Sequence, residues 1–243
     1  MRINYNPVAT GNLIQKVAEA MESEERAEGT HVSALLFCLR KEWARRHNMM
    51  APPTPDTTLV FMTGRALQDY IVGTVNTEVP LVLDSIHGTL DFLDAGVGVP
   101  LEMKATYYSS NDPVEEKAPH YVAQLASYCK MAKVLMGTLC VFYINGPYNL
   151  FRKEANKVRG ADGKPVRSTL MVYDVEFSQD ELDMWWGEML YRKEVLDQAG
   201  DNFSAVPLDL HHTWECDSCS LLGVVCPGGE GRYNEIYQEV FNL

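Results

Sequence analysis

Residues 87–106 constrain the fold of this chain more than any other stretch. Two runs with strand character, residues 86–93 and 99–106, flank a short segment that contains Gly96 and Gly98. Glycine supplies the positive φ that a tight hairpin turn needs. The pattern therefore predicts an antiparallel β-hairpin whose turn is centred just after Gly96.

The predicted register gathers the polar residues of this hairpin on one face. In an antiparallel hairpin the residue numbers of each facing pair have the same sum, so Asp91 lies opposite Glu102. By the same count, Thr89 lies opposite Lys104. Side chains alternate between the two faces of a strand, so the intervening residues point the other way. We expect that second face to pack on the core and to hold the apolar pairs Leu90–Met103 and Phe92–Leu101.

The opposed carboxylates of Asp91 and Glu102 indicate a cation site. Directly opposed cross-strand residues have Cβ atoms about 4.5–5.5 Å apart, where like charges repel. A divalent cation offsets that repulsion, and Mg²⁺ typically takes one or two carboxylates while it keeps waters and substrate phosphate oxygens. Lys104 is then placed to hold or help deprotonate an attacking water. The alternative is a solvent-exposed polar face with an incidental Glu-x-Lys.

Length and charge narrow the class of protein. The chain has 243 residues, which suits one α/β domain with a sizeable core. No apolar run could span a bilayer and the first residues lack the pattern of a signal peptide, so we expect a cytoplasmic protein without a membrane partner. The net charge of −12 at pH 7 argues against a general basic coat for nucleic acid and suits a cation site.

Around the hairpin, periodicity predicts alternating helices and strands. Gln68 falls on one expected helix, and Gln124 and Tyr128 lie four residues apart on one face of another. The alternative is that Gln124 and Tyr128 only lie at the boundary of the apolar face of this helix and have no functional role. Ser33 is the expected N-cap of the second helix. We expect helices at 8–28, 33–48, 58–72, 119–136 and 179–198, and strands at 78–84, 138–145 and 170–177.

Residues 152–167 reverse the acidic balance of the chain locally. The segment holds six basic residues against one Glu and one Asp, and its glycines and proline favour a loop or hairpin tip. Such a segment is a candidate contact for a phosphate backbone, although a solvated loop explains it as well. The candidate residues are Arg152, Lys153, Lys157 and Arg159.

Cysteine spacing predicts a metal centre. Two thiolates separated by two residues can both face one centre, and a third cysteine nearby strengthens the signal. The fourth ligand could be His211 or His212, because Cys₃His is a known structural zinc form, or it could be Cys38. The alternatives to a metal centre are a redox-active dithiol and free thiols that bind no metal. The three late cysteines are Cys216, Cys219 and Cys226.

Together these motifs resemble a known family. The chain is similar to the RecB-like branch of the PD-(D/E)XK nucleases, most closely to the CRISPR-associated exonucleases and phage relatives that carry an iron–sulfur cluster. The resemblance implies a restriction-endonuclease-like α/β core, with a mixed central sheet flanked by helices and an iron–sulfur clasp that joins the N- and C-terminal segments. It covers about residues 33–227 and rests on the order of residues 64–68, Asp91, residues 102–104, Gln124, Tyr128, one early cysteine and three late ones.

The family's residue roles carry over position by position. The resemblance implies that Asp91 and Glu102 bind catalytic Mg²⁺ or Mn²⁺, with the backbone carbonyl of Met103 as a further ligand. Lys104 would position the nucleophilic water. The pair Gln124 and Tyr128 matches a motif that lies beside the active site and contacts the DNA backbone. The residues that match the ligands of a 4Fe-4S cluster are Cys38, Cys216, Cys219 and Cys226.

The resemblance also implies an organisation and an activity. Residues 1–57 form an N-terminal helical segment with the first cluster cysteine, residues 58–200 the nuclease core, and residues 201–243 a cysteine-rich segment. The implied activity is metal-dependent exonuclease cleavage at DNA ends, commonly with a preference for single strands. CRISPR adaptation or recombination proteins are the implied partners.

Gln68 departs from the family pattern. Relatives usually carry a metal-binding histidine at this position, and an amide oxygen is a poorer ligand than imidazole for Mn²⁺ though acceptable to Mg²⁺. Because Asp91, Glu102 and Lys104 are intact, we expect an active enzyme. The alternatives are a weakly or non-catalytic subunit that binds DNA ends or a partner in CRISPR adaptation or phage recombination, and a zinc-clasped interaction protein.

Overall fold

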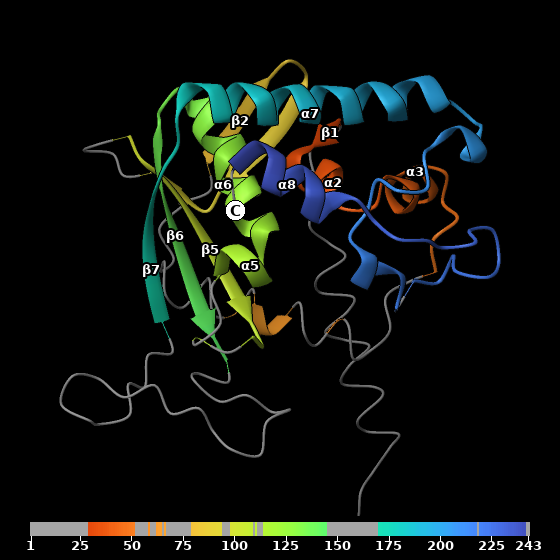
Figure 1. Ribbon diagram of the computed structural model, residues 1–243, viewed down its shortest axis with the longest axis horizontal. Coiled ribbons are helices and arrows are strands. Elements are labelled where there is room, and N and C mark those ends of the chain that lie inside the picture. The colour runs from red at the N-terminus through yellow and green to blue at the C-terminus, as the bar shows by residue number, and fades with distance from the viewer. Residues whose placement is uncertain are drawn as a thin grey trace, which may run out of the picture.

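The chain folds into two β-sheets flanked by helices (Figure 1). This mixed α/β architecture confirms the expected fold class at that level. None of the described helices is both long and apolar enough to cross a membrane. The computed structural model describes residues 29–51, 58, 62–64, 66, 79–93, 98–108, 110, 114–144, 170–217 and 219–241, apart from the side chains of residues 92 and 93.

The smaller sheet has the strand order β1-β3-β2. β2 (Val79–Leu83) and β3 (Ile86–Leu90) form an antiparallel hairpin. The turn between them uses Asp84 and Ser85 at φ angles of 50° and 61°, as a two-residue hairpin turn requires. β1 (Thr30–His31) pairs parallel to β3. The strand expected at 78–84 is therefore confirmed.

The larger sheet has the strand order β4-β5-β6-β7. The central strands β5 and β6 are parallel, and both outer pairings are antiparallel. The strands expected at 138–145 and 170–177 are present with slightly shifted ends. The four strands are β4 (Phe92–Leu93), β5 (Pro100–Thr106), β6 (Met136–Tyr143) and β7 (Leu170–Glu176).

The expected hairpin is correct near its turn and wrong farther from it. Phe92 pairs with Leu101, which is the predicted register. At Asp91, however, the chain leaves one sheet and enters the other. Thr89 pairs with Pro80 rather than facing Lys104, and Leu90 pairs with Val79 rather than Met103. The reason is that the short Asp84–Ser85 turn closes β3 onto β2 and so occupies that edge of β3.

Helix α6 (Pro119–Ala132) lies against both sheets and is buried along most of its length. It begins with a proline at its first turn and ends at Lys133, which adopts the left-handed conformation at φ 60°. Glycines on the strands allow the close approach: a Cβ at Gly88 would lie 2.9 Å from Tyr128, and a Cβ at Gly137 would lie 2.7 Å from Leu125. The expected helix at 119–136 thus ends four residues early. The segment before it contains a short helix, α5 (Val114–Lys117).

The long helix α7 (Gln179–Ala199) packs on α6 and runs along the upper edge of the view in Figure 1. Ser178 and Glu181 form a capping box at its start. Trp185 and Trp186 are buried, as expected for core residues, and the indole N–H of Trp185 donates to Ser127 Oγ at 2.8 Å. Helix α8 (Tyr233–Phe241) packs against both α6 and α7.

The single helix expected from Ser33 to about residue 48 is wrong. It is two helices, α2 (Val32–Leu36) and α3 (Leu39–Arg46), and the N-cap of α2 is His31. Backbone groups at the break bind the C-terminal part of the chain instead of continuing the helix. The Phe37 carbonyl accepts the Tyr233 hydroxyl at 2.7 Å, and the Cys38 N–H donates to Glu215 at 3.1 Å. The break therefore places Cys38 beside the tail.

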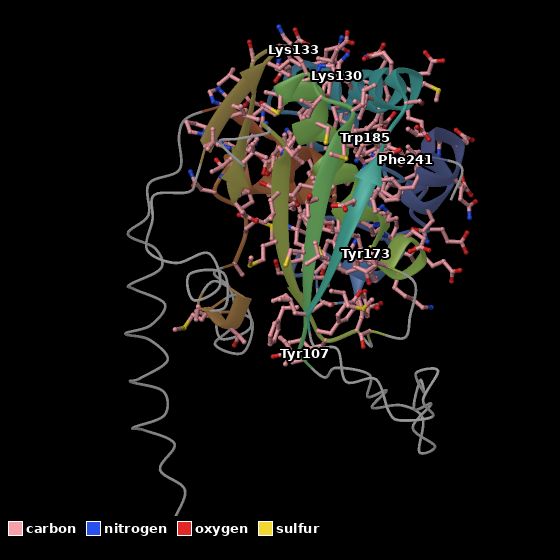
Figure 2. The ribbon with its side chains drawn as sticks, turned by 90° about the vertical axis from the view of Figure 1, so that its left-hand side faces the viewer. Tyr107, Lys130, Lys133, Tyr173, Trp185 and Phe241 are labelled. Carbon is pink, nitrogen blue, oxygen red and sulfur yellow. The ribbon has the colours of Figure 1, made fainter. Side chains whose placement is uncertain are left out.

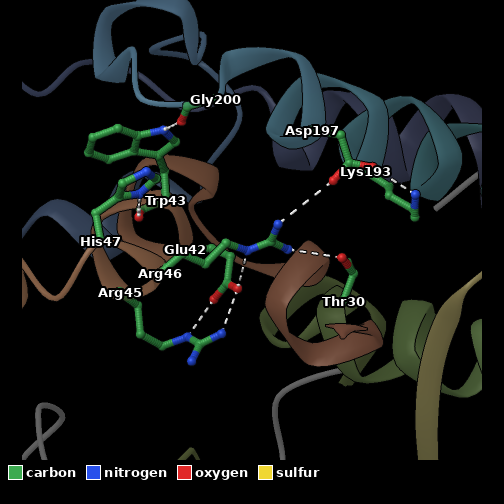
Figure 3. A network of polar contacts seen from close by, with 9 residues as sticks. All are labelled: Thr30, Glu42, Trp43, Arg45, Arg46, His47, Lys193, Asp197 and Gly200. Carbon is green, nitrogen blue, oxygen red and sulfur yellow. Dashed lines mark hydrogen bonds and ion pairs between the residues drawn. The ribbon is translucent and has the colours of Figure 1, made fainter. Parts of the chain in front are cut away.

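Helix α3 is tied to α7 by the network in Figure 3. Buried Glu42 accepts hydrogen bonds from both Arg45 and Arg46, and Arg46 also contacts Thr30 and Asp197. These arginines therefore have structural partners.

Candidate active site

Strand β5 carries Glu102 and Lys104 on the face that α6 covers. Glu102 is 2% exposed, although the sequence predicted its face of the strand to be the polar one. Lys104 Nζ forms an ion pair with Glu102 Oε1 and lies 5.8 Å from the centre of the Tyr121 ring on α6. The other carboxylate oxygen, Glu102 Oε2, is buried and has no hydrogen-bond partner among the described residues. An acceptor left in this state is costly unless another group binds it.

Burial sets the electrostatics of this pair. It raises the pKa of Glu102 to about 7, because the favourable charge of Lys104 only partly offsets it and the nearby charge of Asp91 adds to it. For Lys104, burial opposes the charged form, but the adjacent Glu102 carboxylate outweighs burial and raises the pKa of Lys104. A cation at the unpartnered oxygen would relieve the cost of ionising Glu102.

Asp91 lies where the chain passes from β3 to β4. Its Oδ2 accepts the N–H of Met103 at 2.7 Å. The carboxylate thus occupies the position in which the backbone carbonyl of a neighbouring strand would otherwise accept this hydrogen bond. This bond holds the Asp91 carboxylate next to the segment that contains Glu102 and Lys104. The structure thus brings together the three residues that the hairpin pattern predicted.

Gln124 and Tyr128 come from α6. The Gln124 amide donates to the Tyr128 hydroxyl at 2.9 Å, and both side chains are buried. Burial, followed by the charge of Glu102, raises the pKa of Tyr128 well above its ordinary value. Tyr128 is therefore close enough to Glu102 for the charge of that carboxylate to affect it. Gln68 and the basic residues Arg152, Lys153, Lys157 and Arg159 lie outside the described residues.

The carboxylates fit a hard divalent cation by their chemistry. Two carboxylates and an unpartnered buried oxygen match what Mg²⁺ takes from a protein, since it keeps several waters. Within the described part of the chain, no three His, Cys, Asp or Glu side chains are grouped closely enough to hold a metal ion by themselves. Such a site would therefore complete its coordination with water and substrate oxygens, or with residues outside the described ranges.

Four cysteines line one pocket between the α2–α3 break and the tail. Cys38 comes from the break between α2 and α3, while Cys216, Cys219 and Cys226 come from the tail. All four are free thiols, and burial raises the pKa of Cys38 to about 11. The pocket brings together cysteines that are far apart in the sequence. The apolar side chains that shield it are Leu208, Leu221 and Leu222.

The donor set of this pocket fits a thiolate-bound metal or cluster. Arg40 Nη1 lies 3.9 Å from Cys226 Sγ, and Lys41 also lines the pocket, so positive charge is available to balance thiolates. His211 lines the pocket too, with its Nε2 on the Gly229 carbonyl at 3.1 Å. His212 instead packs among aromatic rings. The thiols are not gathered at metal-ligand spacing.

A buried network that the sequence did not predict connects the two regions. Glu215 accepts the N–H groups of Cys38 and His212, at 3.1 and 2.9 Å. The His212 ring lies 5.2 Å from the His120 ring, and His120 stands close enough to Lys104 for that charge to lower its pKa. No short motif marks these residues. His120 and Glu215 stand alone in the sequence, and His212 was singled out only as a possible fourth metal ligand.

We expect the free energy of unfolding to fall as the pH drops from 6.5 to 4. Burial lowers the pKa of His120 to about 4 and that of His212 to about 3, from an ordinary value of 6.5. At these two rings the unfolded chain therefore binds more protons over this range, and each ring contributes a loss of about 3 kcal/mol at pH 4. The raised pKa of Glu102 acts in the opposite direction and offsets part of this loss. Urea unfolding at several pH values measures the loss.

His212→Phe keeps the ring packing and removes one titrating group. Its unfolding free energy should therefore fall less steeply with acid than that of the wild type. Parallel pH curves for wild type and His212→Phe would contradict the assignment.

Comparison with known proteins identifies structural neighbours only. No family model and no curated protein matches the sequence. The crystal structure of SSO0001 is similar over 92% of this chain and 98% of that chain, with a TM-score of 0.56 and 17% sequence identity. This likeness shows a shared fold. A phage-related exonuclease from Haemophilus somnus 129PT covers 79% of this chain and 82% of its own, with a TM-score of 0.37 and 10% identity, which is too distant for a conclusion about this fold.

Proposed function

We propose that this protein is a metal-dependent DNA exonuclease with a PD-(D/E)XK core, acting at DNA ends and favouring single strands. The observation that carries the proposal is the buried Glu102 carboxylate. One of its oxygens binds Lys104, and the other has no partner among the described residues. Asp91 stands beside it. A buried acid, a second acid and a lysine form the set that the family resemblance assigns to phosphodiester hydrolysis.

In the proposed reaction the residues of the candidate site would have separate roles. Asp91 and Glu102 would hold Mg²⁺ or Mn²⁺, with the Met103 carbonyl as a further ligand. When bound, the metal supplies Lewis-acid stabilisation of charge on the phosphate and activates water. Lys104 would hold the attacking water, and the Gln124–Tyr128 pair would contact the DNA backbone. Bound cations also invert the local potential, which allows an acidic protein to approach DNA.

The cysteine pocket would hold a structural 4Fe-4S cluster rather than take part in cleavage. Its four thiols come from both ends of the folded chain, and the pocket is separate from Asp91 and Glu102. A cluster there would act as a clasp between Cys38 and the tail. We place the protein in the cytoplasm of a bacterial, archaeal or phage-infected cell, with CRISPR adaptation or recombination proteins as candidate partners.

One experiment tests these assignments together. The full chain is purified anaerobically, its visible spectrum is recorded, and end-labelled single- and double-stranded DNA are incubated with Mg²⁺, Mn²⁺ or EDTA. We expect a coloured protein that cleaves DNA with either metal and not with EDTA. Cleavage that survives Asp91→Ala would contradict the catalytic assignment of Asp91. DNA binding without metal-dependent cleavage would favour the weakly catalytic end-binding subunit.

Gln68→His should shift the metal preference of cleavage towards Mn²⁺. Imidazole is a better ligand than an amide oxygen for Mn²⁺, whereas Mg²⁺ accepts amide oxygens. We expect the ratio of Mn²⁺-supported to Mg²⁺-supported rates to rise about tenfold, in line with the 10–100-fold effects of altered metal surroundings. Gln68→Ala is the control, because it removes the amide without adding imidazole. An unchanged ratio in Gln68→His would mean that residue 68 is not near the metal.

A further inference from the structure

His211 is a buried histidine of the tail that has no part in the proposed cleavage reaction or cluster. Its side chain lines the cysteine pocket, and the residue is 2% exposed. Its Nε2 lies 3.1 Å from the Gly229 carbonyl oxygen. A carbonyl oxygen only accepts hydrogen bonds, so Nε2 carries the ring proton and donates it. Nδ1 of the neutral ring therefore keeps a bare lone pair.

This Nδ1 atom is an orphan acceptor in the described part of the chain. It is buried and has no hydrogen-bond partner among the described residues. A buried acceptor in this state costs free energy unless a donor or a cation reaches it. Metal-binding histidines typically donate their other ring N–H to a carboxylate, a backbone carbonyl or water, which fixes the tautomer. His211 thus has the tautomer that a metal ligand requires.

Close packing of two tail segments holds the His211 ring in place. A Cβ at Gly231 would lie 1.9 Å from the His211 carbonyl oxygen, so a larger residue there would displace the backbone. The Gly231 N–H donates to Thr213 Oγ1 at 3.2 Å, and the Arg232 N–H donates to the Asp209 carbonyl at 2.9 Å. These contacts join the segment that carries His211 to the segment that carries its carbonyl partner.

The helices on either side of the tail are fixed in the core. α7 precedes the tail and α8 follows it. The rings of Trp185 on α7 and Phe241 on α8 lie 5.7 Å apart, and both residues are labelled in Figure 2. The tail is therefore a loop whose two ends are anchored to each other.

Tight turns hold the three tail cysteines within this loop. The Cys219 N–H donates to the Cys216 carbonyl at 3.2 Å, and the Cys226 N–H donates to the Leu221 carbonyl at 3.0 Å. All three thiols line the pocket together with His211. One loop thus supplies three sulfur donors and one nitrogen donor.

The space between these donors suits a single ion. The pocket has room for about one water-sized atom, whereas a cluster would need the pocket to widen. Among the described residues the donors do not yet stand at metal-ligand spacing, so an ion would draw them together. Cys38 is less free to follow, because its N–H is held by Glu215 at 3.1 Å. A thiol must also lose a proton to bind metal, whereas a bare imidazole nitrogen need not.

We propose that the three tail cysteines and His211 bind a single Zn²⁺ ion, in a state of the pocket that does not use Cys38. Three cysteines and one histidine form a known tetrahedral set for structural zinc. On binding, each of the three thiols gives one proton to water, and His211 gives none. The inference goes beyond the proposed function, since the tail would close around zinc whether or not the protein cleaves DNA.

A cobalt titration tests this ligand set. The full chain is prepared free of metal, kept anaerobic and titrated with Co²⁺, whose visible bands report tetrahedral thiolate coordination. We expect wild type and Cys38→Ser to show the same bands and the same affinity, and Zn²⁺ to displace the Co²⁺. His211→Ala should weaken Co²⁺ binding about 100-fold or more, because loss of an outer-shell partner alone costs 10- to 100-fold.

His211→Cys and His212→Phe are the matched variants. His211→Cys replaces the nitrogen donor by a fourth sulfur, so binding should persist with stronger thiolate-to-metal absorbance and with about four protons released in place of three. His212→Phe changes the neighbouring histidine, which packs among aromatic rings, and should leave the bands and the affinity unchanged. Circular dichroism of each variant shows that it is folded.

The zinc site and the proposed cluster can fail separately. Tetrahedral Co²⁺ bands that are absent in wild type, unchanged in His211→Ala or lost in Cys38→Ser would overturn the zinc site. The colour of the anaerobically purified wild type would still support the cluster in those cases. A wild type that is colourless as purified and binds Co²⁺ through His211 would support the zinc site and overturn the cluster.

Discussion

Lys104→Met is expected to lower metal-dependent DNA cleavage by about 100- to 10,000-fold. A positioned group that transfers protons or stabilises developing charge contributes an effect of this size. Lys104 is bonded to Glu102, so the single substitution also leaves a buried carboxylate without its cation. We therefore expect a loss of stability as well, up to about 3 kcal/mol, because breaking one partner of a buried pair is costly.

The double variant Glu102→Gln/Lys104→Met separates catalysis from stability. It removes both charges, so the thermal stability lost in the single variant should return while cleavage stays absent. Lys193→Met, at a surface lysine of α7 that pairs with Asp197, is the control and should retain wild-type activity. Cleavage by Lys104→Met within tenfold of wild type would remove Lys104 from the mechanism. Rates from labelled DNA and melting temperatures from circular dichroism give both readouts.

Cys38→Ser and Cys219→Ser are each expected to abolish the visible absorbance of the anaerobically purified protein. Both residues line the pocket, but they come from opposite ends of the chain. A bound cluster stabilises only the folded state, so its loss removes folding free energy. At a cost of about 3 kcal/mol the melting temperature would fall by roughly 6–12 °C.

Cys140→Ala is the matched control for these variants. Cys140 is buried in β6 and lies outside the cysteine pocket, so the absorbance should remain. Equal loss of colour in Cys140→Ala would contradict the assignment of ligands. A wild-type protein that is colourless and contains zinc would show that the pocket binds zinc and not a cluster. Unchanged metal content in Cys38→Ser would favour His211 as the fourth ligand.

The strand pattern predicted the Phe92–Leu101 register because a glycine-containing turn and a period of two are local properties. It could not predict where the chain changes sheets. That point depends on the competing turn at Asp84 and Ser85, neither of which is a glycine. The positive φ values of this turn are tolerated because the β2–β3 pairing and packing favour them.

The candidate site, too, could be predicted from the sequence only in part. That Asp91 lies near Glu102 and Lys104 could be predicted because Asp91 is next to the correctly predicted Phe92–Leu101 pair. The burial of Glu102 could not, since it follows from α6 packing against Gly88 and Gly137. His120 and Glu215 are single residues whose neighbours come from other parts of the fold, so their roles depend on tertiary structure alone.

The hydrogen bond from Cys38 to Glu215 joins residues 177 positions apart. During synthesis the first cysteine leaves the ribosome long before the other three. Its pocket cannot form until the tail has been made and folded back onto the break between α2 and α3. Insertion of a metal or cluster into this pocket would therefore be a late step of maturation, and the colour of the protein would report that the tail cysteines have reached Cys38.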